Sequence, residues 1–295
     1  GWVIELDLEK FFDKVNHDKL MGLLAKKISD KRILKLIRSY LNSGIMEDGV
    51  VTARTEGTPQ GSPLSPLLSN VVLNELDKEL EARGHRYVRY ADDCSIYVKS
   101  EKSAQRVMES ITDYIEKKLK LKVNRTKSKV SRPQDSVLLG FSFYSSKEGW
   151  QVRIAPKSLD KIRKKMKEQT KRNDPSPAKE KIKKMEAVIR GWVNYFAIAR
   201  GKKKMQELDE LVRTRLRMGI WKQWKKPKTK RIHLIKLGIP KPKAYEWSNS
   251  RKGFCRIAHS PILCRALNNE YFTRLRYIGF TNYYYWKTEH QLKLF

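Results

Sequence analysis

The chain has 295 residues, of which 40% are hydrophobic, which is enough for two or three modules that each bury a core. A formal net charge of +32 accompanies seven Trp, thirteen Tyr and nine Phe, and this aromatic content excludes a disordered basic tail. The three cysteines form no CxxC pair and no apolar run reaches the roughly 18 to 20 residues of a membrane span, so a disulfide framework, a thiolate zinc site and a membrane protein are not expected.

The charge is concentrated in the second half of the chain. Residues 1–150 hold 26 Lys and Arg against 21 Asp and Glu, for +5, whereas residues 151–295 hold 38 against 11, for +27. Such a field attracts polyanions, and aromatic residues interleaved with the charge favour nucleic acid as the partner. A solvated basic face and an anionic membrane surface are the alternatives.

The first half of the chain predicts an α+β domain, because short alternating segments are interspersed with helical periodicity. In chain order, we expect strand 2–8, helices 20–28 and 33–41 with Ser29 as the cap of the second, strand 50–55, a Gly/Pro-rich loop GTPQGSPLSP, helix 68–80, strands 86–90 and 94–98, helix 101–119, and strands 137–143 and 150–154.

The second half predicts helices. Three segments after Pro156 each carry one apolar stripe and a Lys/Arg-rich remainder, which is typical of a basic three-helix bundle. From residue 227 onward the sequence is rich in Lys, Arg, Tyr and Trp and predicts a small further module.

Three carboxylates stand out in the first half: Asp7 near the end of the first strand, and Asp92 with Asp93 between two strands that predict a hairpin. Hard divalent cations prefer carboxylate oxygens, and two Mg²⁺ ions can stabilise the attacking and leaving oxygens of phosphoryl transfer. Taken alone, an Asp-Asp pair in a loop is more often a solvated turn than a metal site.

Five blocks occur in a fixed order: DLEKFFD (7–13), TPQGSPLSP (58–66), YADD (90–93), NRTKSK (124–129) and LLGFSFY (138–144). With these blocks the chain closely resembles the reverse transcriptases encoded by bacterial group II introns. The resemblance continues through IRGWVNYFAIA (189–199) and the segment 208–239, which is similar to the maturase, or X, region that doubles as the polymerase thumb.

The resemblance implies a right-hand polymerase with an α+β palm over residues 1–155, an all-α three-helix thumb over 156–226 and a basic nucleic-acid-binding region over 227–295. It implies RNA-directed DNA synthesis together with splicing of an intron RNA. The expected partners are the intron RNA, an RNA template with a DNA primer, dNTP and a target DNA, in a bacterial cytoplasm. The fingers that precede Asp7 in this family are absent, so we expect an upstream segment or a separate chain to supply them.

The family's site residues carry over to matching positions. The resemblance implies that two Mg²⁺ ions are held by Asp7, Asp92, Asp93 and the backbone carbonyl of Leu8, and that Lys127 acts on the pyrophosphate leaving group, although Lys129 is close to it in sequence. The incoming nucleotide would contact Leu8, Phe12, Gln60 and Gly61, with the Phe12 ring excluding a 2′-hydroxyl; core packing beside Phe11 is the alternative for Phe12. Leu139, Gly140 and Phe141 match the primer grip.

Phosphate contacts are expected where basic residues cluster without neighbouring acids. The candidates are Lys202, Lys203, Lys204, Lys225, Lys226, Lys228, Lys230 and Arg231. Two other functions stay open: a splicing maturase without significant polymerase activity, and a reverse transcriptase of a retron or defence system.

Overall fold

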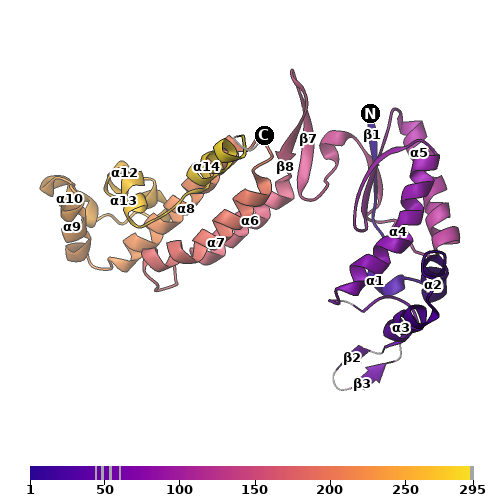
Figure 1. Cartoon of the computed structure of the whole chain (residues 1–295). Helices are drawn as coiled ribbons and strands as arrows, with labels where there is room; N and C mark the ends of the chain where they lie inside the picture. The colour runs from indigo at the N-terminus through magenta and orange to yellow at the C-terminus, as the bar shows by residue number, and fades with distance from the viewer. Residues whose placement is uncertain (44, 48–49, 53–54, 60, 293–295) are drawn as a thin grey trace. The chain divides into compact units, whose positions relative to one another are not determined.

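The computed structural model of the chain describes residues 1–43, 45–47, 50–52, 55–59 and 61–292. It divides into two compact units, Gly1–Leu138 and Leu139–Phe295, which are described separately below (Figure 1). The three regions expected from the sequence, with boundaries at residues 155 and 226, stay a prediction. In the described part of the chain, every helix is too short or too polar to cross a lipid bilayer.

Unit 1 contains a four-stranded antiparallel sheet in the order β4-β5-β1-β6. The strands are β1 (Trp2–Leu6), β4 (Arg86–Tyr90), β5 (Asp93–Val98) and β6 (Lys129–Ser131). Strand β1 pairs with β5 from Trp2↔Val98 to Leu6↔Cys94, so the first strand lies in the middle of the sheet. Because side chains alternate along a strand, Ile4 and Leu6 enter the core while their odd-numbered neighbours face the other side.

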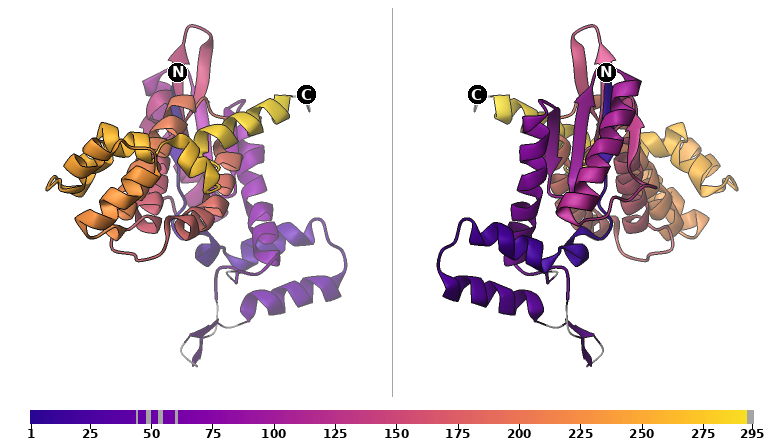
Figure 2. Two further views of the ribbon diagram at one scale, coloured as in Figure 1. Left: turned by 90° about the vertical axis from the view of Figure 1, so that its left-hand side faces the viewer. Right: turned by 90° about the vertical axis from the view of Figure 1, so that its right-hand side faces the viewer.

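Helices cover one face of this sheet. Helix α5 (Glu101–Tyr114) contacts β1, β5 and β6, and α4 (Leu64–Ala82) contacts β4. The other helices are α1 (Phe11–Lys14), α2 (His17–Ala25) and α3 (Lys31–Asn42), and Figure 2 shows the hairpin of β2 (Ile45–Glu47) and β3 (Val50–Thr52) extending away from them. The sheet and helices share one apolar core, and the expected α+β class is confirmed.

Several boundaries differ from the expected ones. The cap of α3 is Asp30, whose Oδ1 accepts the amide of Arg32 at 2.7 Å, and not Ser29. Helix α5 is followed by a π-helical turn, Ile115–Leu119, which ends where Lys120 adopts a left-handed conformation with φ 58°. Strand β6 was not expected, because its three residues are defined only by pairing with β1.

Unit 2 begins with a two-stranded hairpin and continues as helices. The elements are β7 (Phe141–Ser146), β8 (Gly149–Ile154), α6 (Pro156–Gln169), α7 (Ala178–Phe196), α8 (Lys202–Gln223), α9 (Pro227–Lys236), α10 (Lys241–Ser248), α11 (Phe254–Ala258), α12 (Pro261–Ala266), α13 (Asn269–Arg274) and α14 (Phe280–Leu292). One apolar core runs from Ile154 to Phe280, so the C-terminal helices pack on the same core as the three-helix bundle.

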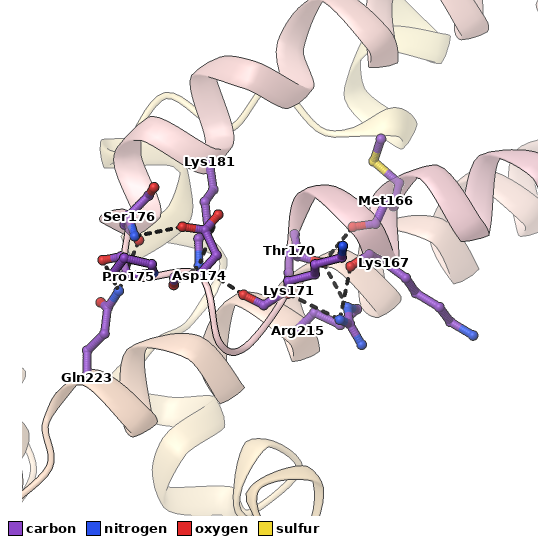
Figure 3. A network of polar contacts seen from close by, with 10 residues as sticks. All are labelled: Met166, Lys167, Thr170, Lys171, Asp174, Pro175, Ser176, Lys181, Arg215 and Gln223. Carbon is purple, nitrogen blue, oxygen red and sulfur yellow. Dashed lines mark hydrogen bonds and ion pairs between the residues drawn. The ribbon is translucent and has the colours of Figure 1, made fainter.

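Side chains of α7 and α8 hold the loop between α6 and α7 (Figure 3). Arg215 of α8 donates from Nε to Thr170 Oγ1 at 2.8 Å and from Nη2 to the Thr170 carbonyl at 3.2 Å. Lys181 of α7 is 4% exposed and donates from Nζ to the carbonyls of Lys171 (3.2 Å) and Asp174 (2.9 Å). Burial lowers the pKa of Lys181, and these carbonyls compensate its charge, so the loop is fixed to the bundle.

A buried carboxylate anchors the last helix of unit 2. Asp209 on α8 is 3% exposed and accepts from Tyr277 Oη at 2.7 Å. It also accepts from the backbone amides of Phe280 (2.8 Å) and Thr281 (2.9 Å), which are at the N-terminus of α14. A carboxylate at a helix N-terminus satisfies amides that have no partner within the helix, so Asp209 ties α14 to α8.

Candidate active site

Asp7 directly follows β1, and the segment that contains the NRTKSK block fixes its backbone. The amide of Asn124 donates to the Asp7 carbonyl at 2.8 Å, and the Asp7 amide donates to Ser128 Oγ at 3.0 Å. Leu8 forms an isolated antiparallel bridge with Val123. Two blocks that are more than a hundred residues apart are therefore adjacent in space, as a shared site requires.

Asp92 and Asp93 lie at the turn of the β4–β5 hairpin. The final pair of that hairpin is Tyr90↔Asp93, which leaves Ala91 and Asp92 as the two turn residues. The β1–β5 register ends at Leu6↔Cys94, and one further step of the same register would set Asp7 opposite Asp93. Because residues directly opposite in an antiparallel pair lie on the same face, the two carboxylates lie on the face away from the helices.

The electrostatics of the site are those of crowded carboxylates. Burial raises the pKa of Asp93, and the negative charges of Asp92, Asp7 and Glu5 raise it further, whereas Lys127 lowers it. These contributions show that the field of all three neighbouring carboxylates reaches Asp93. The site therefore carries excess negative charge that a cation would neutralise.

Two lysines of the NRTKSK block take separate partners. Lys127 Nζ lies 3.6 Å from Asp7 Oδ2, and its side chain is 68% exposed. Lys129 Nζ lies 3.1 Å from Glu5 Oε2 and also donates to the Asp135 carbonyl at 3.2 Å. The structure thus distinguishes the two residues: Lys127 is beside Asp7, whereas Lys129 belongs to a neighbouring ion pair.

The donor set suits a hard divalent cation that also binds a substrate phosphate. Within the residues that the structure describes, no group of three or more His, Cys, Asp and Glu side chains is arranged to hold a metal ion by itself. A Mg²⁺ site in phosphoryl chemistry commonly takes only one or two carboxylates and completes its shell with substrate phosphates and water. Asp7 and Asp93 at opposed positions, next to Asp92, fit that kind of site.

The residues predicted to contact the nucleotide lie near α1 and the following loop. Phe12 is half-buried with its ring centroid 5.3 Å from that of Phe11, which is only 3% exposed, so Phe11 is the core residue of the pair. The Phe12 carbonyl accepts the amide of Thr58 at 2.6 Å, which joins α1 to the TPQGSPLSP segment. Gly61 has φ 81°, a conformation that favours glycine, and Gln60 lies outside the described residues.

The predicted primer grip is built into unit 2. Leu139 and Gly140 have φ 52° and 80°, so the predicted strand 137–143 was wrong at its start: β7 begins only at Phe141. A Cβ at Gly140 would lie 2.8 Å from Ser158 Oγ, which explains the glycine. Tyr195 Oη donates to the Leu139 carbonyl at 2.9 Å and its ring stacks on Phe141 with centroids 5.5 Å apart. The LLGFSFY segment is therefore fixed to α6 and α7.

The predicted phosphate contacts divide into two groups. Lys203, Lys225, Lys226 and Lys228 have exposed side chains. The other four contact neighbouring side chains: Lys204 pairs with Glu207 at 2.8 Å, and Lys202, Lys230 and Arg231 lie over the rings of Tyr285, Trp221 and Tyr245 at 5.2, 4.5 and 4.2 Å from the ring centroids. The first group is exposed to solvent and is therefore accessible to phosphate.

Sequence reasoning missed two residues of this site. Glu5 is two positions before Asp7 and so lies on the same face of β1, which strand alternation could have revealed. Its Oε1 accepts the amide of Val137 at 2.8 Å, which joins the segment after β6 to the site. Ser128 holds the Asp7 backbone but occurs in the NRTKSK block as an ordinary small polar residue, and no sequence signal marks its role.

Comparison with known families is consistent with this geometry. Residues 1–143 match the family model described as "Reverse transcriptase (RNA-dependent DNA polymerase)". Residues 159–237 match the model described as "Group II intron, maturase-specific domain". The first match contains the carboxylates, Lys127 and the primer-grip segment, and the second contains α7, α8 and the exposed lysines.

Individual relatives extend the comparison. Protein YkfC of Escherichia coli is 33% identical over 171 residues, covering 46% of this chain and 45% of YkfC. The uncharacterized 91 kDa protein in the cob intron of Schizosaccharomyces pombe is 45% identical over 80 residues, covering 27% of this chain and 10% of that protein. The group II intron-encoded protein LtrA of Lactococcus lactis is 27% identical over 213 residues, covering 50% of this chain and 36% of LtrA.

The matched regions span less than half the length of each of these relatives. Even so, the two domain matches occur in the order expected from the sequence blocks: the first covers unit 1 and the first residues of unit 2, and the second lies within unit 2. The chain therefore combines a segment that matches the reverse transcriptase model with one that matches the group II intron maturase-specific model, and in this arrangement it is similar to the group II intron reverse transcriptase/maturases.

Proposed function

We propose that the chain is an RNA-directed DNA polymerase that extends a DNA primer on an RNA template. The observation that carries this proposal is that the strand registers bring Asp7 next to the turn that contains Asp92 and Asp93, with Lys127 Nζ 3.6 Å from Asp7 Oδ2. Separate segments supply a cluster of carboxylates and a cation to one place, which is what metal-assisted transfer of a nucleotide needs.

Asp7, Asp92, Asp93 and the carbonyl of Leu8 would hold two Mg²⁺ ions, which would supply charge stabilisation at the attacking and leaving oxygens when bound. The primer 3′ oxygen forms a bond to the α-phosphorus of the dNTP and loses its proton to solvent. The bond from the α-phosphorus to the bridging oxygen breaks, and pyrophosphate leaves. Lys127, whose Nζ lies beside Asp7, would give a proton to this leaving group or neutralise its charge.

The remaining predicted residues act on substrate position. The half-buried ring of Phe12 would exclude ribonucleotides, and Gly61 with Gln60 would contact the incoming nucleotide. Leu139, Gly140 and Phe141 would hold the primer end, since their backbone is fixed by contacts to α6 and α7. These roles are proposals that rest on the matched positions of the reverse transcriptase blocks.

Primer extension on an RNA template tests the proposal. Asp92→Ala should reduce extension by about 10²- to 10³-fold, as expected when a charge-stabilising group is removed from such a site. Asp113→Ala is the matched control, because this carboxylate on α5 is exposed and already pairs with Lys117, and it should extend at the parental rate. Equal extension by Asp92→Ala and the parent would refute the metal assignment.

A second activity, binding of intron RNA, is favoured by the exposed lysines of the maturase-specific domain and the segment before α9. The match over residues 159–237 supports a maturase role and not a retron or defence role. If splicing assistance persists in Asp92→Ala while extension is lost, both activities reside in the chain. If the parent assists splicing but never extends a primer, the maturase without polymerase activity is the better description.

A further inference from the structure

Arg89 on β4 makes an unusual number of contacts next to the acidic turn. Its Nε donates to Asp77 Oδ1 at 2.7 Å and its Nη2 to Asp77 Oδ2 at 2.5 Å, a bidentate pair with a residue of α4. Its Nη1 donates to Asn70 Oδ1 of α4 at 3.2 Å and to the Ala91 carbonyl at 2.8 Å. The side chains of Arg89 and Asp77 are only 13% and 19% exposed. One guanidinium thus connects helix α4 to the turn.

The turn that Arg89 contacts has a strained backbone. Ala91 has φ 53°, in the left-handed region that non-glycine residues rarely adopt. Such a conformation persists only where surrounding contacts hold it. The Ala91 carbonyl is part of the peptide that leads directly into Asp92, so a contact to this oxygen acts on the orientation of both carboxylates that follow.

Arg89 reaches the turn from the side opposite to the carboxylates. It pairs with Cys94 in the β4–β5 register, and Cys94 is 3% exposed within the helix-covered core. Tyr90 and Asp93, the next pair, face the other side. The guanidinium is therefore directed away from the face that carries Asp93, and it contacts the turn through the Ala91 carbonyl.

We propose that Arg89 is a positioning residue: anchored by Asp77 on α4, it holds the Ala91 carbonyl and thereby fixes Asp92 and Asp93 in the geometry that nucleotide transfer requires. This inference rests on the proposed polymerase function. An arginine is needed because its planar fork bonds Asp77 with two nitrogens and still presents a third to Ala91, which the single ammonium of lysine cannot do.

The test compares Arg89→Lys with Arg83→Lys. Arg83 is a matched control, because it also bonds a carboxylate of α4, Glu79, at 2.7 Å, and a second segment through Ser110 Oγ at 3.0 Å, without contacting the turn. Arg89→Lys should lower kcat of primer extension by about 10- to 100-fold, the usual effect of misplacing reacting groups by about 1 Å, with KM for dNTP within about threefold of the parent. Arg83→Lys should leave both values unchanged.

Hydrogen exchange provides a readout that does not depend on activity. In Arg89→Lys, the amides of residues 91–93 should exchange at least about tenfold faster than in the parent while the core amides of β1 keep parental rates; in Arg83→Lys both sets should be unchanged. If Arg89→Lys does not fold, Asp77→Asn keeps the guanidinium and removes the charge that anchors it, and should give a smaller change of the same kind.

The outcomes separate this inference from the proposed function. If the parent extends primers and Arg89→Lys extends them equally well, the positioning role is wrong although the polymerase assignment stands. If the parent does not extend primers, hydrogen exchange alone tests the positioning role. Amides of residues 91–93 that exchange in Arg89→Lys at the parental rate would overturn the inference. A uniform acceleration of exchange throughout unit 1 would show a general structural role and would also overturn it.

Discussion

Asp209 in unit 2 and Asp93 in unit 1 show two ways in which a folded chain treats a carboxylate. Asp209 is 3% exposed and accepts hydrogen bonds from one hydroxyl and two amides. Asp93 is more exposed, and its neighbours are the carboxylates of Asp92, Asp7 and Glu5. The first carboxylate is matched by donors of the protein itself, whereas the second is left with excess negative charge, so only the second is suited to bind a cation.

The largest effect should come from removing the carboxylate of Asp209. Asp209→Ala leaves the Tyr277 hydroxyl and two amides of α14 buried without an acceptor, which should lower the free energy of unfolding of unit 2 by about 3–5 kcal/mol. Denaturant unfolding, with hydrogen exchange of α14 as the local readout, measures this loss.

Asp209→Asn is the control for that variant, because it keeps the side-chain volume and one acceptor oxygen. It should lower the free energy of unfolding by about half as much as Asp209→Ala. If Asp209→Ala is as stable as the parent and α14 stays protected, Asp209 does not anchor the helix. In that case Asp209 would not be a structural carboxylate, and the contrast with Asp93 would not hold.

A smaller effect, on activity and not on stability, is expected at Lys127. Lys127→Gln removes the cation beside Asp7 and should lower kcat of primer extension by about 10²-fold, the lower range for loss of a general acid. Because the Lys127 side chain is 68% exposed, the thermal unfolding midpoint of the Lys127→Gln protein should stay near the parental value.

Lys129→Gln serves as the comparison, since Lys129 pairs with Glu5 and not with Asp7. Its kcat should fall by less than about threefold, within the range of an exposed ion pair. If the two variants lose activity equally, the distinction that the structure draws between these lysines is not functional.

The exposed lysines should affect RNA binding through its salt dependence. Each phosphate contact that is lost should reduce the slope of log K against log salt by about 0.7–0.9. Lys225, Lys226 and Lys228 changed together to Gln should therefore reduce the slope by about 2, whereas Lys204→Gln should leave it unchanged because Lys204 already pairs with Glu207. Binding measured at about 50 to 300 mM salt distinguishes the two groups, and equal slopes would show that the exposed lysines do not contact phosphate.

The smallest effect is a gain of stability at Asp93. Because the pKa of Asp93 is raised in the folded chain, its ionised form opposes folding; this penalty is absent below the pKa of the unfolded chain, about 3.9, and complete above the raised pKa. Asp93→Asn should therefore be more stable than the parent at pH 7, by less than about 1 kcal/mol.

The difference in stability between Asp93→Asn and the parent should shrink as the pH falls through the pKa of Asp93. It should vanish near pH 4, where the protonated acid is as neutral as Asn. Thermal unfolding of both proteins from pH 4 to pH 7 without metal measures it. A parent that is more stable than Asp93→Asn at pH 7 would show that Asp93 is a structural carboxylate like Asp209.

Local patterns predicted much of the molecule. Alternation in residues 2–8 predicted β1, helical periodicity predicted α6 to α8, and the strands around YADD predicted a hairpin, because each signal is a property of neighbouring residues. The five sequence blocks predicted the candidate residues through their resemblance to a family, whereas composition alone left the Asp-Asp pair undecided.

Features set by distant residues were not predictable in this way. Strand β6 exists only because Val3 to Glu5 pair with it, and the Asp209 contacts join residues about 70 positions apart. The role of Arg89 depends on which face of β4 meets α4, and one sequence without the fold does not reveal a contact to Asp77.

Metal binding tests the central claim most directly. Mn²⁺, which shares the preference of Mg²⁺ for oxygen ligands and is visible by electron paramagnetic resonance, would be titrated into the protein with an RNA–DNA duplex and dNTP. The account predicts saturable binding by the parent that is lost when Asp7, Asp92 and Asp93 are changed together to Asn, with the fold retained. Equal Mn²⁺ binding by the parent and the triple variant would contradict it.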